Sequence, residues 1–164
     1  MIRACIGVGS NIDRDSNIRS GLRALSELGG PMAVSTVYQS KAWGFEGEDF
    51  YNLAVAFDTQ LDAVTLCERL RQIEQRHGRV RDVPRFSSRT LDLDLLLYGD
   101  LVRHDGLVDV PRKDILTCAF VLRPLVEIAG QLQHPESGIR ISVVWEAFDR
   151  PDQQTWPVMF DWKQ

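Results

Sequence analysis

The sequence has few cysteines, no long apolar run and no excess of positive charge. Its three cysteines, Cys5, Cys67 and Cys118, lie far apart and show neither the spacing of a zinc site nor an even disulfide set. A reducing compartment is the simplest setting for them. No stretch approaches the roughly 18 apolar residues of a membrane helix, and the N-terminal apolar run is too short for a signal peptide. We therefore expect a cytoplasmic protein without a membrane partner.

Net positive charge, which a general nucleic-acid binder would need, is also lacking. The chain has 19 basic and 23 acidic residues, a net charge of −4, so any anion site needs a local basic cluster. No GxxxxGK[ST] motif is present, and Gly7-Val8-Gly9 is too weak a pattern to predict a dinucleotide site. The 164 residues, 44% of them hydrophobic, suffice for one compact domain spanning residues 1–164.

Hydrophobic periodicity predicts an alternation of strands and helices. Alternating or β-branched segments predict strands at 2–8, 33–39, 50–58 and 90–98, and apolar residues at helical spacing predict helices within 18–28 and 63–77. The order β-α-β-β-α-β is typical of a ferredoxin-like α+β fold, with an antiparallel sheet and helices on one of its faces. We also expect a short strand near 107–110, a helix over 117–128 that Pro124 could kink or split, and C-terminal additions that pack onto the domain.

Two carboxylates stand out in the segment RTLDLDLLLYGD. Period-2 alternation places Leu91, Leu93, Leu95 and Leu97 on the core face of the predicted strand and leaves Asp92 and Asp94 on the opposite face. Like charges there repel, and aspartate is a poor strand former. A magnesium ion, which takes one or two carboxylates together with phosphate and water oxygens, would offset this cost. The alternative is an ordinary solvated strand face.

A basic loop precedes this strand. It contains the arginines Arg76, Arg79, Arg81, Arg85 and Arg89, and Arg112 with Lys113 adds a second basic pair. Arginine binds phosphate through bidentate, charge-assisted hydrogen bonds. Beside a metal-holding carboxylate pair, such a loop could grip a polyphosphate, although a solvated loop paired with nearby acids is the alternative. We therefore expect phosphoryl or pyrophosphoryl transfer from a nucleotide.

Aromatic side chains surround a glycine-bearing loop at residues 40–49. Trp43, Phe45 and Phe50 flank it, and Asn52 lies on the same strand face as Phe50. Aromatic rings with one amide can hold a flat heterocycle, because the rings stack and the amide both donates and accepts hydrogen bonds. Simple core or lid packing is the alternative.

Five ordered motifs resemble one enzyme family. IGVGSN, WGFEGEDFYNLAV, IEQRHGRVR, SSRTLDLDLLLYGD and AFVLRPLVEIA together resemble the 6-hydroxymethyl-7,8-dihydropterin pyrophosphokinases of folate biosynthesis. The resemblance implies transfer of the β,γ-diphosphate of ATP to the pterin hydroxymethyl group, with release of AMP and no covalent intermediate. It also implies two magnesium ions, with ATP as co-substrate. We further expect a monomer that binds these small molecules and, given the net charge of −4, no nucleic acid.

The resemblance assigns roles to particular residues. Asp92 and Asp94 match metal ligands, and together with Arg81 and Arg89 they are the expected catalytic residues. The expected pterin-binding residues are Ser40, Lys41, Trp43, Phe50, Asn52, Asp92 and Phe120, with Phe50 and Phe120 on either side of the ring. The expected ATP-binding residues are Glu74, Arg79, Arg81, Phe86, Arg89, Leu95, Arg112 and Lys113, with Phe86 on a loop that closes over the site.

Two positions depart from the family pattern. The family usually carries a histidine where this chain has Arg112, and an arginine where it has Cys118. The alternative reading is therefore a divergent pterin-binding paralogue with weak or altered transferase activity. A ferredoxin-like RNA-binding module is a second alternative, but it would need a basic sheet face, whereas the fourth predicted strand carries two aspartates.

Overall fold

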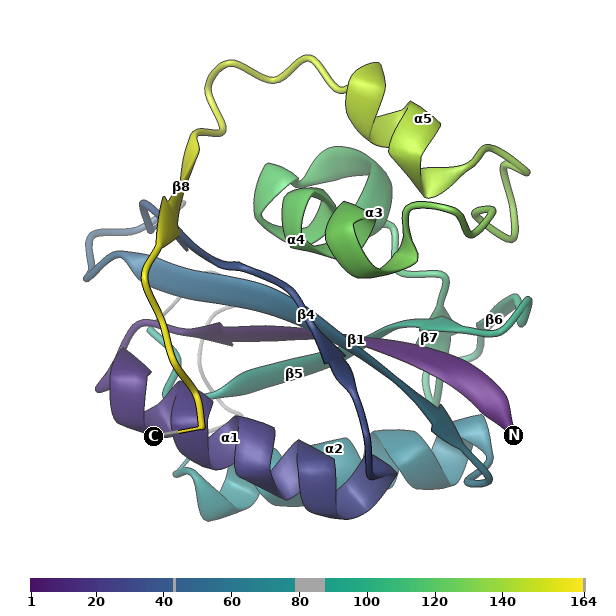
Figure 1. Ribbon diagram of the computed structural model, residues 1–164, viewed down its shortest axis with the longest axis horizontal. Helices are drawn as coiled ribbons and strands as arrows, with labels where there is room; N and C mark the ends of the chain where they lie inside the picture. The colour runs from purple at the N-terminus through teal and green to yellow at the C-terminus, as the bar shows by residue number, and fades with distance from the viewer. Residues whose placement is uncertain (43, 79–87, 164) are drawn as a thin grey trace.

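A computed structural model describes residues 1–42, 44–78 and 88–163 of the chain. Its main sheet has the order β5-β1-β4-β3-β8, and β2 also pairs with β4 (Figure 1). All the pairings are antiparallel. The strands of this sheet are β1 (Ile2–Ser10), β2 (Ala33–Val34), β3 (Val37–Ser40), β4 (Phe50–Thr59), β5 (Asp92–Tyr98) and β8 (Thr155–Val158). A small hairpin, β6 (Arg103–His104) with β7 (Asp109–Val110), follows β5.

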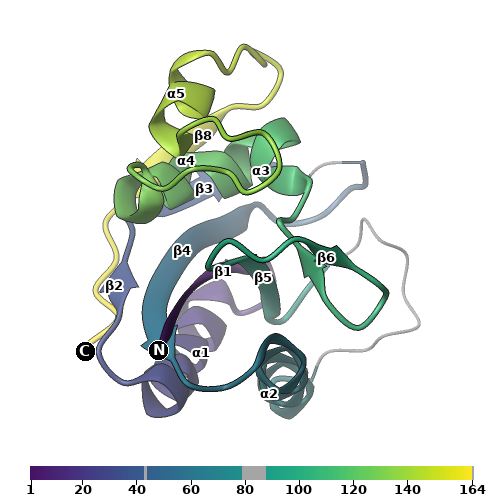
Figure 2. The same ribbon diagram turned by 90° about the vertical axis from the view of Figure 1, so that its right-hand side faces the viewer.

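Helices cover both faces of the sheet (Figure 2). Helices α1 (Arg14–Gly29) and α2 (Ala63–Arg76) pack on one face, where Leu22 and Leu66 meet Ile6 and Val55. Helices α3 (Asp114–Thr117), α4 (Ala119–Ala129) and α5 (Ile141–Glu146) lie over the other face. The α+β fold with an antiparallel sheet is confirmed. The prediction of helices on one face holds for α1 and α2, but α4 and its neighbours form a second layer, with its own hydrophobic core.

Predicted helix boundaries follow from local chemistry. The side chain of Asp62 accepts a hydrogen bond from the backbone N–H of Thr65 at 3.0 Å, so it caps the N-terminus of α2. Gly30, at φ 71°, ends α1 in a conformation that favours glycine. His77 follows the last turn of α2, where its ring nitrogen lies 2.7 Å from the carbonyl oxygen of Ile73.

Two strand predictions need correction. The segment 33–39 divides into β2 and β3 because Ser35 Oγ accepts from the N–H of Ala54, and the N–H of Thr36 turns to Glu127 in α4. The first strand does not end at Val8 but continues through Gly9 and Ser10. Its glycines remain in the ladder because neighbouring strands pair with them on both sides.

The core-facing residues of β5 also differ from those that strict period-2 alternation predicts. Between β1 and β5 the register shifts, so that Ile6 pairs with Leu95 but Cys5 pairs with Leu97. This bulge inserts Leu96 as an extra residue and turns Leu97 into the α4-side core. The prediction that Leu97 shares a face with Leu91, Leu93 and Leu95 is therefore wrong, while these three do lie together in the α1–α2 core.

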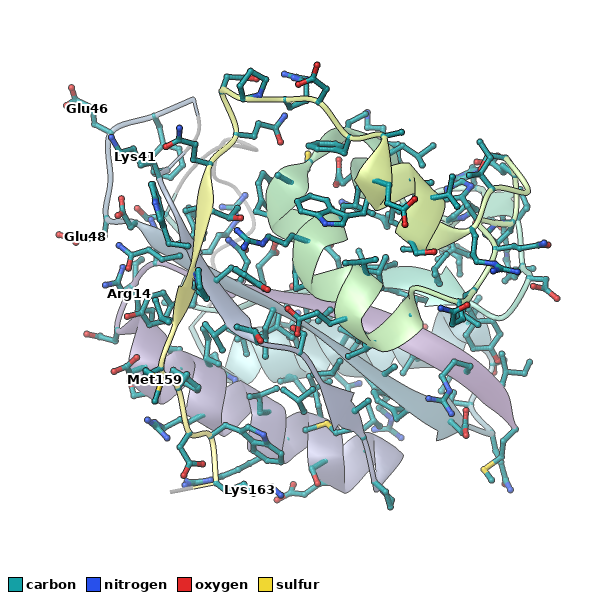
Figure 3. All side chains as sticks on the ribbon, turned by 45° about the horizontal axis from the view of Figure 1, so that its top comes forward. Arg14, Lys41, Glu46, Glu48, Met159 and Lys163 are labelled. Atoms are coloured by element: carbon teal, nitrogen blue, oxygen red, sulfur yellow. The ribbon has the colours of Figure 1, made fainter. Side chains whose placement is uncertain are left out.

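The third predicted helix begins later than expected. Cys118 is extended, at φ −123° and ψ 117°, and separates the single turn of α3 from α4. Pro124 lies inside α4 without dividing it. After α5 the chain passes back to the sheet, where β8 pairs with β3. Phe160 and Trp162 then pack against the α1–α2 core, as expected of the C-terminal additions, and Figure 3 shows Met159 and Lys163 along this tail.

Candidate active site

Three strands build the floor of the site around two glycines. Gly9 of β1 pairs with Asn52 of β4 on one side and with Asp92 of β5 on the other. Gly7, two residues earlier on the same face, pairs with Asp94 of β5. Because glycine has no side chain, the space between the amide and the two carboxylates stays open. A Cβ atom at Gly9 would lie 2.8 Å from Asn52 Oδ1, so a side chain there would close this space.

A cavity of about 590 Å³ opens above this floor. Its wall includes the predicted residues Ser40, Lys41, Phe50, Asn52, Arg89, Asp92, Asp94, Arg112, Lys113 and Phe120. They come from β3, β4, β5, the loop before α3, and α4, so the fold brings together side chains that are far apart in the sequence. The predicted sharing of one face by Asp92 and Asp94 is confirmed, since both line this cavity.

One end of the cavity is aromatic. Phe50 comes from β4, and Phe120 comes from the first turn of α4, which lies over the sheet. Phe45 also lines the cavity and meets Phe50 edge to face, with ring centroids 6.2 Å apart. Asn52 donates to Ser40 Oγ at 3.1 Å, which fixes the amide beside these rings. This end offers apolar faces and one oriented amide, the features that suit a flat heterocycle.

The loop between β3 and β4 borders this end. It carries Lys41, Glu46 and Glu48, which Figure 3 shows projecting beyond the edge of the sheet. Lys41 lines the cavity although its side chain is exposed. The backbone carbonyl of Glu48 accepts a hydrogen bond from Asn11 Nδ2 at 3.0 Å, which ties this loop to the end of β1.

A second cavity of about 390 Å³ adjoins the first. Glu74 and Leu95, two of the predicted nucleotide-side residues, line this cavity and not the larger one. Arg89, Asp94 and Arg112 line both cavities. The shared wall thus carries one carboxylate and two guanidinium groups, which is where a phosphate chain passing from one cavity to the other would lie.

Arg112 is held by three carboxylates. Its Nη2 donates to Asp114 at 3.1 Å and lies 3.7 Å from Asp94 Oδ1, and its Nη1 lies 3.7 Å from Asp109. Burial alone would lower the pKa of Arg112, but Asp94 and Asp114 raise it above its usual range, so the charge is retained. Its buried Nε has no hydrogen-bond partner among the described residues. Arg112 is thus a charged group at the wall between the cavities.

Arg89 is positioned by the end of β1. Its backbone N–H donates to Asn11 Oδ1 at 2.7 Å, and its carbonyl accepts from the N–H of Asn11 at 3.0 Å. Ser10 Oγ donates to the carbonyl of Thr90 at 2.6 Å. The side chains of Ser10 and Asn11 were not assigned a role from the sequence. Their place directly after the paired glycines of IGVGSN is the signal that could have found them.

The two aspartates of β5 supply only some of the oxygen ligands that a magnesium ion needs. Among residues 1–42, 44–78 and 88–163, no group of three or more His, Cys, Asp or Glu side chains could hold a metal ion. Asp92 and Asp94 supply two carboxylates to one cavity, which matches magnesium sites that are completed by substrate phosphates and water. The residues therefore fit a magnesium ion that arrives with a nucleotide.

Four predicted site residues, Trp43, Arg79, Arg81 and Phe86, lie outside the described residues. The cavity wall also includes residues that the sequence did not indicate, among them Gly7, Gly9, Asp114, Thr117 and Arg150. The role of the two glycines depends on strand register, so no local pattern indicates it, and Arg150 also carries no local signal.

The chain matches known proteins over most of its length. Residues 5–130 match the family model for 7,8-dihydro-6-hydroxymethylpterin-pyrophosphokinase (HPPK). The 2-amino-4-hydroxy-6-hydroxymethyldihydropteridine pyrophosphokinase of Haemophilus influenzae is 36% identical over 153 residues, which cover 91% of this chain and 95% of the relative. The protein of the same name from Aquifex aeolicus is 35% identical over 137 residues, covering 82% and 85%.

Solved structures support the fold. A crystal structure of Plasmodium falciparum HPPK-DHPS superposes with a TM-score of 0.69 at 12% identity and covers 88% of this chain. This chain spans only 43% of that longer protein. At such low identity the likeness concerns the antiparallel sheet and its helices, and family membership rests on the sequence matches.

Proposed function

Because this chain belongs to the 7,8-dihydro-6-hydroxymethylpterin-pyrophosphokinase family, we propose that it transfers the β,γ-diphosphate of ATP to 6-hydroxymethyl-7,8-dihydropterin, with release of AMP. The chain is a transferase of the pyrophosphokinase type, and its family acts in folate biosynthesis. A divergent pterin-binding paralogue is not favoured, since relatives that match nearly the whole chain are named as pyrophosphokinases.

The observation that carries the proposal is the wall shared by the two cavities. The larger cavity has the aromatic and amide groups suited to a pterin, and the smaller one has Glu74 and Leu95. Two substrates bound on either side would meet at Asp94, Arg89 and Arg112. A reaction between two small molecules needs such a meeting point, because positioning supplies a large share of the rate.

In the proposed complex, Phe50 and Phe120 contact the two faces of the pterin ring. Asn52, oriented by Ser40, pairs with one edge of the heterocycle. Lys41 contacts it from the loop after β3, and Trp43 is proposed to bind it as well. The cavity wall supports this arrangement, because its aromatic groups come from opposite layers of the fold. Asp92 lies where the exocyclic hydroxymethyl group would approach the phosphates.

The phosphate chain is bound by carboxylate-held magnesium and by arginines. Asp92 and Asp94 would hold two magnesium ions, which when bound neutralise phosphate charge and polarise the phosphoryl oxygens. Arg89 and Arg112 stabilise the charge that develops between the leaving AMP and the transferred group. Arg81 is proposed for the same task, Arg79 and Lys113 for phosphate binding, and Phe86 for closure over the nucleotide.

We further propose that residues 1–164 act as one pyrophosphokinase domain and as a cytoplasmic monomer that binds no nucleic acid. Pairing of β8 with β3 supports a single unit, because it ties the C-terminal segment into the main sheet. None of the three cysteines forms a disulfide within the described ranges. Among those ranges no helix has the length and apolar character that crossing a bilayer requires.

The test is an assay of AMP release from ATP and 6-hydroxymethyl-7,8-dihydropterin with magnesium. We expect Asp94→Ala to lose on the order of a hundredfold or more in turnover, with an unchanged thermal melting temperature. Asp100→Ala, an exposed carboxylate just after the same strand, is the matched control and retains activity. Near wild-type AMP release by Asp94→Ala would contradict the metal role, and no AMP release by the unaltered protein would contradict the proposed reaction.

A further inference from the structure

An arginine from the C-terminal segment reaches the larger cavity. Arg150 lines this cavity together with Cys118, Thr117 and Val121, although it lies beyond the residues 5–130 that match the family model. Its side chain is 45% exposed, so it lies at the rim of the cavity and not in its floor. Figure 1 shows the segment between α5 and β8 passing over the α3–α4 layer.

A tight turn presents Arg150. The backbone N–H of Gln153 donates to the carbonyl of Arg150 at 2.9 Å, which closes a four-residue turn. Pro151 and Asp152 occupy the two central positions, and proline at the first of these is favoured in such turns. Because proline fixes its own backbone angle, the turn holds Arg150 in one place on the segment.

Gln153 fastens this turn to the cavity wall on both sides of Cys118. Its Oε1 accepts from the N–H of Ala119 at 2.8 Å, and its Nε2 donates to the carbonyl of Thr117 at 3.0 Å. These two backbone groups flank the extended residue at which α3 ends and α4 begins. The side chain of Gln153 therefore fixes the turn to the α3–α4 junction and determines the position of Arg150.

The guanidinium of Arg150 already pairs with Asp152. It donates to both carboxylate oxygens of this residue, each at 3.2 Å. At that distance and exposure the pair is weak, so a ligand with more negative charge can take over part of the arginine's hydrogen bonds. The planar guanidinium fork matches the oxygens of a phosphate group.

The described wall of the cavity favours an anion. Its basic residues are Lys41, Arg89, Arg112, Lys113 and Arg150, and its acidic residues are Asp92, Asp94 and Asp114. Of these basic residues, Arg89 lies just before β5, and Arg112 and Lys113 lie between β7 and α3. Arg150 adds a cation from the C-terminal segment, above the α3–α4 junction.

We propose that Arg150 is a phosphate-binding residue of the larger cavity, held in place by Gln153 as a positioning residue. This inference rests on the proposed function and assigns part of the phosphate chain of ATP, or of the diphosphate being transferred, to the C-terminal segment. Arg150 lines the larger cavity and not the smaller one, so it would bind the phosphates that extend past the shared wall toward the pterin, and not the pterin ring.

The first experiment compares Arg150→Gln with Arg140→Gln, an exposed arginine elsewhere in the C-terminal segment. For Arg150→Gln we expect the KM for ATP to rise roughly tenfold, the scale of one lost charge-assisted hydrogen bond, with the KM for the pterin and the melting temperature unchanged. Arg140→Gln keeps both KM values. An unchanged KM for ATP in active Arg150→Gln, or a change confined to the pterin KM, overturns the inference.

Binding measurements separate this inference from the proposed function. If the unaltered protein releases no AMP, the proposed function fails, and calorimetric binding of α,β-methylene-ATP with magnesium still tests Arg150. Weaker binding of this analogue by Arg150→Gln than by Arg140→Gln then supports phosphate binding by Arg150, and equal binding overturns it.

The positioning role has its own test. Gln153→Ala frees the turn from Thr117 and Ala119, so we expect the KM for ATP to rise as in Arg150→Gln. Because Gln153 acts through Arg150, the double variant is expected to be no worse than Arg150→Gln alone. Additive losses in the double variant would overturn the positioning role.

A rescue variant, with an arginine introduced at Cys118, provides a further test. Cys118 lines the same cavity beneath the turn, so Cys118→Arg in the Arg150→Gln background offers a guanidinium to the same phosphates. Recovery of the KM for ATP supports the assignment. An ATP defect that stays undiminished, with the fold intact, shows that a missing charge was not its cause and overturns the inference.

Discussion

The guanidinium Nη2 of Arg112 lies 3.7 Å from a carboxylate oxygen of Asp94. Both residues line both cavities. A cation is therefore already close to one of the two proposed metal ligands. The same arginine is expected to help bind the phosphates of ATP. Its removal should consequently affect metal binding and nucleotide binding in opposite directions.

We predict that Arg112→Gln binds a divalent ion more tightly in the absence of nucleotide. Two unit charges about 4 Å apart interact by about 1 kcal/mol in water, so the gain is roughly fivefold. The KM for ATP should rise at the same time, because a phosphate-facing cation is lost. Manganese titration followed by electron paramagnetic resonance, and AMP-release kinetics, measure the two effects. Arg103→Gln, which removes a surface pair with Asp105, is the control, and weaker manganese binding by Arg112→Gln would contradict the prediction.

We predict that a side chain at Gly9, which pairs with Asn52 and Asp92, weakens pterin binding selectively. In Gly9→Ala the new Cβ would meet Asn52 Oδ1 at 2.8 Å, so the amide must turn away from its hydrogen bond with Ser40. We expect the KM for the pterin to rise up to about tenfold, the value of one oriented hydrogen bond, with little change for ATP.

A graded control lies on the same strand. In Gly7→Ala the new Cβ would meet only the flexible end of Leu96, at 3.4 Å, so its effect on the pterin KM should be clearly smaller. Steady-state kinetics with each substrate varied in turn separates the two variants. Equal effects at Gly7 and Gly9 would show that contact with Asn52 is not the cause.

The shared face of Asp92 and Asp94 could be predicted from the sequence because it depends on local geometry alone. Asp92 and Asp94 alternate with leucines, and side-chain alternation is a property of any strand. The glycine floor could not be predicted in the same way. Its meaning depends on the register that places Gly9 between Asn52 and Asp92, and register is set by contacts between distant segments.

Other differences also arise from tertiary contacts. Leu97 changed faces because a bulge at Leu96 interrupts the pairing with β1, and periodicity does not reveal a bulge. Arg150 reaches the cavity through a turn fixed by Gln153 to the α3–α4 junction. Nothing in the residues around position 150 indicates that partner, so the contribution of the tail became visible only in three dimensions.

His104 predicts a pH-dependent contribution to stability. Its ring nitrogens lie 2.5 Å from Asp109 and 3.3 Å from Glu136, and the hydrogen bond to Asp109 raises the pKa of His104 above its usual value. A raised pKa means that protonation stabilises the folded state. This contribution is complete below about pH 6.5 and is lost as the pH rises through the folded-state pKa.

We therefore expect the melting temperature of the unaltered protein to exceed that of His104→Gln at about pH 6 and the difference to shrink toward about pH 9. Since His104 is exposed, about 1 M salt should reduce the difference at low pH. Differential scanning calorimetry across this range checks both effects. A difference that grows with pH would contradict the assignment of a stabilising protonated ring.

Glu74 gives the last prediction, because it has both a structural and a proposed binding role. It is 3% exposed, and its Oε1 accepts a hydrogen bond from the N–H of Leu93 at 2.8 Å, between the two aspartates of β5. Glu74→Ala removes this acceptor, so we expect a loss of about 1–3 kcal/mol in the free energy of unfolding. Glu74→Gln keeps an acceptor oxygen of nearly the same shape and should unfold close to the unaltered protein. Because Glu74 also lines the smaller cavity, Glu74→Gln should still raise the KM for ATP and leave that for the pterin unchanged. Urea unfolding and steady-state kinetics on the same preparations separate the two roles. If Glu74→Gln unfolds as easily as Glu74→Ala, the negative charge and not the acceptor oxygen holds α2 against β5.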